Sequence, residues 1–364
     1  MKLAYRCVLL AILTIICGLF LVRKVYRNGI GEIQNEQESK IDDVEAHLAP
    51  VGSYSGNETK FVIHLVLVVC GDRLKQAMIC IKSALLFARS PLKVHIFAEN
   101  ELKKPLEDQL HSWRDSFDQH WTFVVQALSF PAESENEWKK LFKPCAAQRL
   151  FLPSAMNDTD AVIYVDIDTL FLSPVDILWD KFNFMNSSQM AALAPESEDF
   201  STGWYNRFAR HPYYGPLGLN SGVMLMNLTR FRRFQWELYL VPTYQQYKLN
   251  ITWGDQDIIN IIFHYHADKI LVLPCEFNYR PDHCMYMSVC RTVENNGVYV
   301  LHGNRGAFIN EKQPTFRAFY DSFNEFIPGE KLTSLVELVS AKFDATSPSN
   351  CGKMRKFLLK NLEY

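Results

Sequence analysis

The chain has 364 residues, of which 48% are hydrophobic, and its formal net charge is −2. This amount of apolar material is enough for one large α/β domain or two small ones. A nucleic-acid-binding surface needs a basic patch, and the chain has no basic stripe, so we expect no nucleic-acid partner.

The N-terminus has the composition of a targeting element. Residues 7–22 form an apolar run with basic residues on both sides. A cleaved signal peptide would continue with small residues, whereas Arg23 and Lys24 follow this run directly. The run is short for a plasma-membrane span and suits the thinner membranes of the early secretory pathway. We therefore predict a cytosolic tail (1–6), a transmembrane signal-anchor (7–22) and a flexible stem (23–58).

The body beyond the anchor contains five N-glycosylation sequons, which begin at Asn57, Asn157, Asn186, Asn227 and Asn250. Each is common by chance, but together they favour a lumenal body. The charges beside the anchor nearly balance and do not fix its orientation, so the topology prediction rests on the sequons. We expect a single-pass type II protein of the endoplasmic reticulum or Golgi membrane.

Seven of the nine cysteines lie beyond the anchor, so at least one is free or pairs between chains. Cys70 lies in an apolar segment and is expected to be a small buried residue. The cluster of Cys275, His283, Cys284 and Cys290 is open to two interpretations, a zinc site or disulfide bonds. The lack of a Cys-x-x-Cys pair and the oxidising lumen favour disulfides.

The first part of the body alternates between strand and helix patterns. This alternation predicts a parallel, doubly wound sheet, and the apolar run at 161–165 continues it. The expected strands are 61–70, 92–98 and 121–128, and the expected helices are 72–89 and 101–113. The pattern then becomes irregular, with a strand expected at 222–226, a helix at 231–247, the middle of a buried helix at 258–263 and amphipathic helices from Pro314 onwards.

Two carboxylates follow the apolar run at 161–165. Asp166 and Asp168 are separated by one residue, so in an extended segment their side chains point the same way. Paired carboxylates repel each other unless a cation neutralises them. Ligands of open α/β sheets bind beyond the carboxyl ends of the strands. The pattern predicts a metal site for a phosphorylated ligand, and the alternative is an ordinary surface turn.

Two later segments place small or polar residues beside an apolar run. Residues 220–222 (Asn-Ser-Gly) precede a strand, and the glycine permits close backbone approach by a ligand; the alternative is an ordinary turn. Residues 255–257 (Asp-Gln-Asp) begin a helix. Asp255 is either a cap of that helix or a ligand contact, and three consecutive polar side chains are not all needed as caps.

A last polar segment, 302–306 (His-Gly-Asn-Arg-Gly), follows a short strand. His302 is either a third metal ligand or a hydrogen-bonded core residue. The glycines let the loop curl around a polar ligand, and Arg305 has the geometry to face phosphate.

The four polar segments together resemble the retaining glycosyltransferases of family 8, in order and spacing along residues 61–310. The resemblance implies a GT-A fold, which is a single α/β domain with a Rossmann-like nucleotide-binding half and a mixed sheet. We expect this catalytic domain at 59–330, followed by a C-terminal helical extension at 331–364.

The resemblance also implies roles for single residues. Metal ligation is expected from Asp166, Asp168 and His302, with manganese favoured and magnesium as the alternative. Asp255 and Gln256 are expected beside the donor sugar as catalytic residues. Contacts to the sugar nucleotide are expected from Arg149, Asp166, Asn220, Ser221, Gly303 and Arg305, although Arg149 is also open to interpretation as a structural ion pair.

Two strings, 275–286 and 302–306, resemble the glucoside xylosyltransferases, which extend O-linked glucose on EGF-like repeats. The implied activity is retaining α-1,3-xylosyl transfer from UDP-xylose to O-linked glucose on EGF-like repeats of Notch type. The alternatives are another family 8 enzyme with a glucosyl or galactosyl donor, a catalytically silent lumenal glycan-binding protein, and a sugar-nucleotide hydrolase. For the enzyme we favour same-face attack over a covalent intermediate.

Donor choice makes a separate demand on the pocket. Xylose lacks the hydroxymethyl group of glucose, so a xylosyl enzyme must exclude an added group by steric hindrance. We expect a bulky side chain at that position, with Leu219 and Trp253 as the two candidates.

Overall fold

The structure is a computed structural model that describes residues 61–131, 138, 146–346 and 348–362. The described residues belong to one compact unit, Glu58–Tyr364. The predicted tail, anchor and stem lie outside the described residues. In the described part, no helix is both long enough and apolar enough to cross a membrane.

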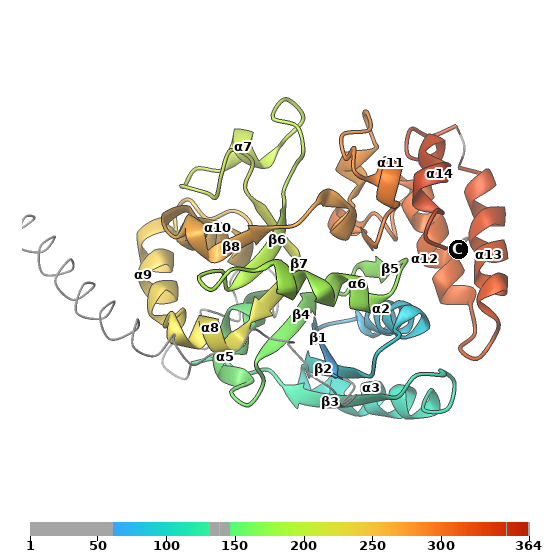
Figure 1. The fold of residues 1–364 in the computed structure, drawn as a ribbon, viewed down its shortest axis with the longest axis horizontal. Helices are drawn as coiled ribbons and strands as arrows, with labels where there is room; N and C mark the ends of the chain where they lie inside the picture. The colour runs from blue at the N-terminus through green and yellow to red at the C-terminus, as the bar shows by residue number, and fades with distance from the viewer. Residues whose placement is uncertain (1–60, 132–137, 139–145, 347, 363–364) are drawn as a thin grey trace, which may run out of the picture. The chain divides into compact units, whose positions relative to one another are not determined.

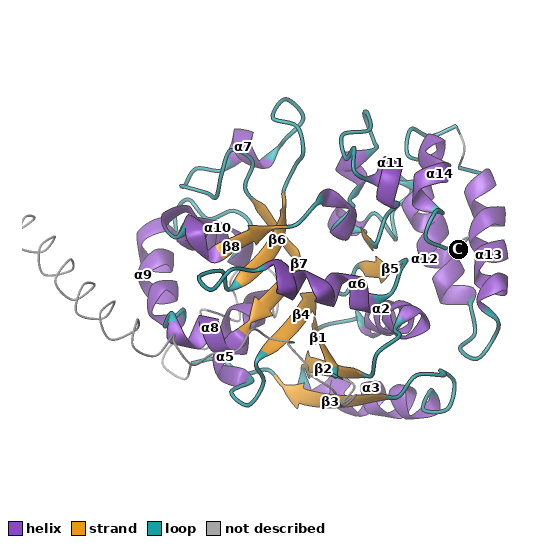
Figure 2. Ribbon diagram, viewed as in Figure 1, coloured by secondary structure: helices purple, strands orange, loops and turns teal. Residues whose placement is uncertain are grey.

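A seven-stranded sheet forms the centre of this unit, with the strand order β3-β2-β1-β4-β7-β6-β8 (Figure 2). Strands β1 to β4 are parallel to one another, whereas β7 runs antiparallel to both of its neighbours. The sheet is therefore mixed, as predicted. Its strands are β1 (Ile63–Val69), β2 (Leu92–Ala98), β3 (Trp121–Ala127), β4 (Ala161–Val165), β6 (Ala191–Pro195), β7 (Leu219–Asn227) and β8 (Ile270–Val272).

The parallel half follows the sequence pattern closely. Helix α2 (Leu74–Phe87) connects β1 to β2, and α3 (Asn100–Ser112) connects β2 to β3. All five elements begin and end within two residues of their expected positions. Apolar strand runs separated by helices favour this arrangement, because parallel neighbours need a crossover connection.

Two apolar clusters cover the two faces of the sheet, so the unit has helix, sheet and helix layers (Figure 1). One cluster packs α2 and the C-terminal helices α12 (Pro314–Glu325) and α13 (Leu332–Asp344). The other packs α8 (Leu228–Arg233), α9 (Glu237–Tyr247) and α10 (Asp255–Tyr265). The C-terminal helices thus share a core with the sheet.

Short elements complete the unit. A two-stranded antiparallel sheet pairs β5 (Thr169–Phe171) with β9 (Val300–His302). The remaining short helices are η1 (Ala146–Phe151), α5 (Leu152–Ala155), α6 (Val175–Trp179), η2 (Asp180–Phe184), α7 (Tyr205–Phe208), η3 (Ala267–Lys269), η4 (Cys275–Phe277), η5 (Pro281–His283), α11 (Val293–Asn296), η6 (Asn304–Gly306), η7 (Gly352–Met354) and α14 (Arg355–Leu358).

The single helix predicted at 231–247 is wrong. The chain forms α8 and α9 instead, and Gln235 between them adopts a positive φ of 58° that a continuous helix does not permit. Asn227 starts α8 by accepting a hydrogen bond from the Arg230 amide, which is N-capping. Because Asn227 is also 6% exposed, its sequon is not accessible in the folded protein.

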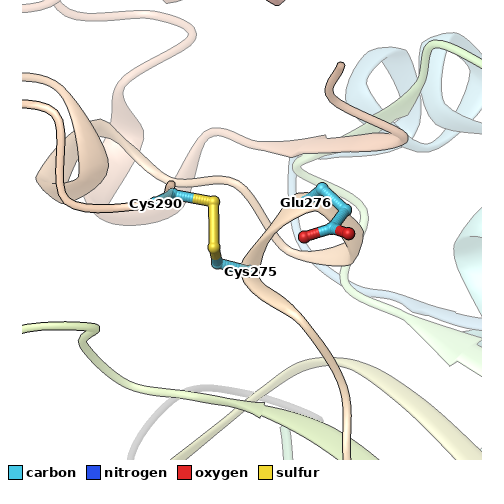
Figure 3. Close-up of side chains that lie close together, drawn as sticks. All are labelled: Cys275, Glu276 and Cys290. Atoms are coloured by element: carbon cyan, nitrogen blue, oxygen red, sulfur yellow. A yellow bond between two sulfur atoms is a disulfide. The ribbon is translucent and has the colours of Figure 1, made fainter. Parts of the chain in front are cut away.

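Disulfides, and not zinc, account for the cysteine cluster. Cys275 pairs with Cys290, and Cys284 pairs with Cys351, which ties the C-terminal segment to the chain before α11. Figure 3 shows the first bond beside Glu276, whose carboxylate could otherwise complete a metal site with those two sulfurs. Cys70 is buried, as expected, but it is also disulfide-bonded, which was not expected. Cys80 is the free cysteine of the described residues.

The sheet topology brings several chain segments to one edge. Strands β1, β4 and β6 end there, and the antiparallel β7 begins there. From β1 the chain adds β2 and β3 on one side, and β4 then lies on the other side of β1. The carboxyl ends of β1 and β4 therefore form the topological switch point at which open α/β sheets bind ligands.

Candidate active site

A pocket of about 430 Å³ lies at this edge of the sheet. Its walls come from the ends of β1 and β4, the start of β7 and α10, and the loops after β6 and β9. The polar and aromatic lining residues include Asp72, Arg73, Arg149, Tyr164, Asp166, Asp168, Glu196, Trp204, Asn220, Ser221, Trp253, Asp255, Gln256, His302, Asn304 and Arg305. A larger hollow of about 730 Å³ lies beside the edge strand β3, far from these groups, and we place the site by its chemistry.

Asp166, Asp168 and His302 meet in this pocket. Their ligand atoms all lie within 4.8 Å of one another. The His302 Nε2 atom is 3.4 Å from Asp168 Oδ1 and 3.9 Å from Asp166 Oδ2. Burial alone would raise the pKa of Asp168, but the hydrogen bond and charge of His302 outweigh it and hold that pKa below its usual value. The three residues therefore fit a divalent cation.

Asn278 fixes the orientation of His302. Its Oδ1 atom is 2.8 Å from His302 Nδ1, while its own amide donates to Asn220 Oδ1 at 2.8 Å. An amide oxygen only accepts, so Nδ1 of His302 carries a proton and Nε2 is the ring atom that faces the carboxylates. Without a cation Nε2 donates to Asp168, and on losing its proton it would offer a lone pair to a metal. A metal ligand needs this tautomer, and Asn278 supplies the partner that fixes it.

Gly222 makes room for this histidine. A Cβ atom at position 222 would lie 2.1 Å from Cε1 of His302. Gly222 therefore permits the close approach of the His302 side chain. The expectation that a ligand lies directly against this glycine is wrong, because His302 occupies that space.

Arg149 joins two parts of the site. The guanidinium lies 3.0 Å from Asp166 Oδ1 and 2.5 Å from Asp255 Oδ2, and it donates to the Ser221 carbonyl oxygen at 2.5 Å. It also stacks over the Tyr164 ring, 4.5 Å from the ring centroid. Burial raises the pKa of Asp255 to about 6, although Arg149 opposes the shift. Asp255 is thus a buried carboxylate already paired with a cation.

Gln256 is held by a polar network at the pocket floor. Its Oε1 atom accepts from the Ser221 amide and hydroxyl, both at 3.3 Å, and its Nε2 atom donates to Glu196 Oε2 at 3.1 Å. The same Glu196 oxygen accepts from the Asn220 amide at 2.7 Å. Burial raises the pKa of Glu196, with Arg280 opposing the shift. The Gln256 amide is therefore fixed in orientation.

The start of α10 depends on a glycine and on Asp257. Gly254 precedes the helix with φ 63°, in the region that favours glycine, and Asp255 makes no capping hydrogen bond. The capping interpretation of Asp255 is therefore wrong. Asp257 instead accepts from the Thr252 and Trp253 amides at 2.7 and 2.8 Å. Its other oxygen accepts from the Tyr205 hydroxyl at 2.7 Å.

The structure brings nearly all of the predicted site residues together. Arg149, Asp166, Asp168, Asn220, Ser221, Asp255, Gln256, His302 and Arg305 line one pocket. Gly303 is not among the lining residues; its amide donates to the Asp168 carbonyl oxygen, and a Cβ atom there would meet the Phe308 ring at 2.4 Å. Arg305 is ion-paired with Asp282 and lies 5.6 Å from the Trp204 ring centroid.

The two candidates for a bulky side chain are separated by the structure. Trp253 lines the pocket, whereas Leu219 is 1% exposed and belongs to the apolar cluster below the sheet. Trp253 packs edge-to-face against Trp204, with 4.7 Å between the ring centroids. Trp204 also lines the pocket and was not expected there.

Sequence reasoning missed Glu196, Asn278, Tyr164 and Trp204. Glu196 directly follows β6, so an acidic residue at the end of a buried strand was a usable signal, as it was for Asp166. Tyr164 is two residues before Asp166, and its hydroxyl donates to that carboxylate at 2.9 Å. Asn278 lies in the string 275–286 that carries the resemblance, but its role was missed because it depends on a partner 24 residues away.

A comparison with family models identifies the chain. The model for glycosyl transferase family 8 matches residues 64–302. The chain belongs to this family. It is therefore a glycosyltransferase, and the match covers β1 through the metal-site histidine.

Curated relatives give a finer similarity. Glucoside xylosyltransferase 1 of Rattus norvegicus is 49% identical over 312 residues, which cover 82% of this chain and 71% of the rat protein. Glucoside xylosyltransferase 2 of Mus musculus is 49% identical over 313 residues, covering 83% and 70% of the two chains.

Solved structures confirm the GT-A fold. The apo form of mouse xyloside xylosyltransferase 1 aligns with a TM-score of 0.52 at 20% identity, covering 69% of this chain and 100% of that one. The galactosyltransferase LgtC, crystallised with donor and acceptor sugar analogues, aligns with a TM-score of 0.53 at 17% identity, covering 77% and 96%.

Proposed function

We propose that this glycosyltransferase is a retaining α-1,3-xylosyltransferase, which moves xylose from UDP-xylose to O-linked glucose on EGF-like repeats of Notch type. The similarity to the glucoside xylosyltransferases of rat and mouse supports this donor and acceptor. The observation that carries the reaction type is the convergence of Asp166, Asp168 and His302, with Gln256 in the same pocket.

The metal site suits the breaking of a sugar–diphosphate bond. Asp166, Asp168 and His302 would hold a divalent cation, and two carboxylates with one imidazole suit manganese better than magnesium. Such a cation supplies positive charge where the leaving diphosphate becomes negative. Asn278 keeps His302 in the metal-binding tautomer, and Arg149 offsets the charge of Asp166.

The surroundings of Asp255 and Gln256 favour same-face attack. Asp255 is 2% exposed and paired with Arg149, so its carboxylate is not free to act as a nucleophile. Gln256 carries an amide, which is a poor nucleophile, and its hydrogen bonds fix it as a positioning group for the donor sugar. The acceptor hydroxyl oxygen then bonds to the anomeric carbon on the face from which the phosphate leaves. Its proton passes to the leaving phosphate oxygen.

Trp253 is the side chain that we assign to pentose selection. Its ring lines the pocket two residues before Asp255, and the Tyr205 and Trp204 rings pack on it at 4.9 and 4.7 Å between centroids. Displacing the Trp253 ring would cost free energy, because it would disrupt this dense aromatic packing. It would exclude the hydroxymethyl group of a hexose donor.

A cellular location follows from the same function. We propose a type II protein of the endoplasmic reticulum or Golgi membrane, anchored by residues 7–22, with the catalytic unit in the lumen. The two disulfides of the described C-terminal part support an oxidising compartment.

A donor competition assay tests the activity. The purified protein is given an O-glucosylated EGF-like repeat, Mn²⁺ and equal amounts of UDP-xylose, UDP-glucose and UDP-galactose, and the product mass is measured. We expect a pentose product, and the variant Trp253→Ala should add a hexose product while keeping UDP-xylose use. Preference of the wild-type protein for either hexose donor would contradict the xylosyl assignment.

A further inference from the structure

The sheet order places two ends of the pocket on opposite sides of the metal-site carboxylates. β1 and β6 flank the β4–β7 pair, and all the segments concerned meet at one edge of the sheet. Asp72 and Arg73, after β1, therefore lie at one end of the pocket. Glu196 and Trp204, after β6, lie at the other end. A donor bound across β1 and β4 leaves the β6 end for the acceptor.

The β6 end is bordered by two segments with exposed apolar side chains. Phe200 and Phe208 lie four residues before and four residues after Trp204 in the sequence, and their side chains are 65% and 60% exposed. Tyr286 and Met287, in the chain before α11, are 69% and 56% exposed. We call these four side chains the rim. Figure 1 shows α7, which contains Phe208, and the chain before α11 at the same side of the molecule.

Arg305 joins both segments at the pocket wall. Its guanidinium lies 5.6 Å from the Trp204 ring centroid and is ion-paired with Asp282, which is four residues before Tyr286 in the sequence. Arg305 also lines the pocket. The Phe208 amide donates to the Trp204 carbonyl oxygen at 3.1 Å, which keeps Phe208 one turn from the pocket. Both segments that carry the rim therefore contain a residue, Trp204 or Asp282, that contacts Arg305 at the pocket wall.

The chemistry of the rim favours a polypeptide over additional sugar. Oligosaccharides need polar partners for their hydroxyl groups, whereas three of the four rim side chains, Phe200, Phe208 and Met287, carry no hydrogen-bond donor. Exposed apolar and aromatic clusters of this kind mark protein interaction surfaces. An acceptor sugar in the pocket must also leave its attachment point outside, beyond Trp204 and Arg305.

We infer that the rim docks the polypeptide to which the acceptor sugar is attached. This inference rests on the proposed function. The acceptor sugar enters the pocket beside Gln256, and apolar side chains of its polypeptide contact Phe200, Phe208, Tyr286 and Met287. The enzyme thereby selects a glycosylated protein over a free glucoside.

Two acceptors distinguish the contribution of the rim to acceptor binding from the contribution of the pocket. One is an O-glucosylated EGF-like repeat, and the other is a small aryl β-glucoside, which reaches the pocket but not the rim. We compare the double variants Phe200→Ser/Phe208→Ser and Tyr286→Ser/Met287→Ser with the wild-type protein under UDP-xylose and Mn²⁺. The control is Phe184→Ser, because Phe184 is 68% exposed and precedes β6, at the opposite end of that strand.

Each rim variant should raise the KM for the repeat by about tenfold, the loss of a moderate interface contact. The KM for the aryl glucoside and for UDP-xylose should change by less than about twofold, as should every constant of Phe184→Ser. An unchanged KM for the repeat, or an equal rise for both acceptors, would overturn the rim assignment. If the wild-type protein transfers xylose neither to the repeat nor to the aryl glucoside, the proposed function is contradicted instead.

Discussion

The parallel half of the sheet, β1 to β4, and the half built around the antiparallel β7 contribute to the active site in different ways. In the parallel half the functional side chains directly follow a strand, as Asp166 follows β4. Around β7 and in the small β5–β9 sheet beside it, they depend on partners far away in the chain, such as Glu196 for Gln256 and Asn278 for His302. The first kind of site can be read from a pattern of strand ends, and the second kind requires tertiary structure.

The largest expected effect comes from the strand-end carboxylates. Asp168→Asn should reduce xylosyl transfer by about a thousandfold, because it removes one of three metal ligands and the charge that binds the cation. The apo melting temperature should stay within a few degrees, because the substitution removes like-charge repulsion with Asp166. Rates with and without EDTA, together with thermal unfolding, measure both effects.

The control for this change is Asp108→Asn, on the exposed face of α3, where the carboxylate pairs with Lys104. It should leave transfer unaltered, because exposed helix ion pairs contribute little. Near-normal transfer by Asp168→Asn would show that the parallel half does not supply the metal site.

Much of the parallel half was predictable because its signals are local. The positions of β1, β2, β3, α2 and α3 follow from runs of apolar residues, and paired carboxylates after β4 identify a site. The family resemblance favoured the metal-ligand interpretation of His302 and placed Gln256 beside the donor sugar. Arg280 shows what neither approach supplies: it is fully buried and donates to the Pro195 and Glu196 carbonyl oxygens, which supports the loop after β6. Nothing in the sequence around Arg280 indicates those partners.

The wrong predictions, for the helix at 231–247 and for two glycines, arose because contacts with distant parts of the chain decided the local structure. The helix expected at 231–247 is interrupted at Gln235, whose φ is positive. The next residue, Trp236, is buried against Phe231 and donates to the Leu150 carbonyl oxygen, and such tertiary contacts outweigh local helix propensity. Gly222 and Gly303 were interpreted as ligand contacts, but a side chain fills the space beside each, His302 and Phe308 respectively. A glycine in a sequence indicates close approach without showing what approaches.

A moderate effect is expected from the distant partner of the metal-site histidine. Asn278→Ala removes the acceptor that keeps the His302 Nδ1 protonated, so the Mn²⁺ concentration for half-maximal activity should rise about 10- to 100-fold. The rate at saturating Mn²⁺ should recover toward the wild-type value. A metal titration of activity, with Asp168→Asn beside it, separates weakened affinity from a lost ligand.

The matched variant is Asn278→Asp, whose carboxylate still accepts from Nδ1 and should keep more of the metal affinity than alanine. If Asn278→Ala instead lowers only the melting temperature, with an unchanged metal requirement, Asn278 serves the core alone. The contrast between the two halves would then be one of stability and not of metal binding.

The smallest expected effect concerns Glu198, in the loop after β6. Burial raises the pKa of this carboxyl to about 7, and Arg280 only partly opposes the shift. Between its ordinary pKa of 4.5 and a folded-state pKa of about 7, the folded protein binds the proton more readily than the unfolded chain. The free energy of unfolding should therefore decline as the pH rises through this window.

Glu198→Gln removes the titrating group and keeps the size of the side chain. The variant should be more stable than the wild-type protein at pH 7.5, with a gain on the order of 1 kcal/mol, and should differ little from it at pH 4.5, where the wild-type carboxyl is protonated. Chemical denaturation at both pH values measures the difference. If the stability gain is the same at both pH values, the pKa of Glu198 is not raised by folding. The loop after β6 would then accommodate a carboxylate charge without cost. A loss at pH 7.5 would mean that the ionised carboxylate is needed beside the buried Arg280, so that charge pairing outweighs burial in this half of the site.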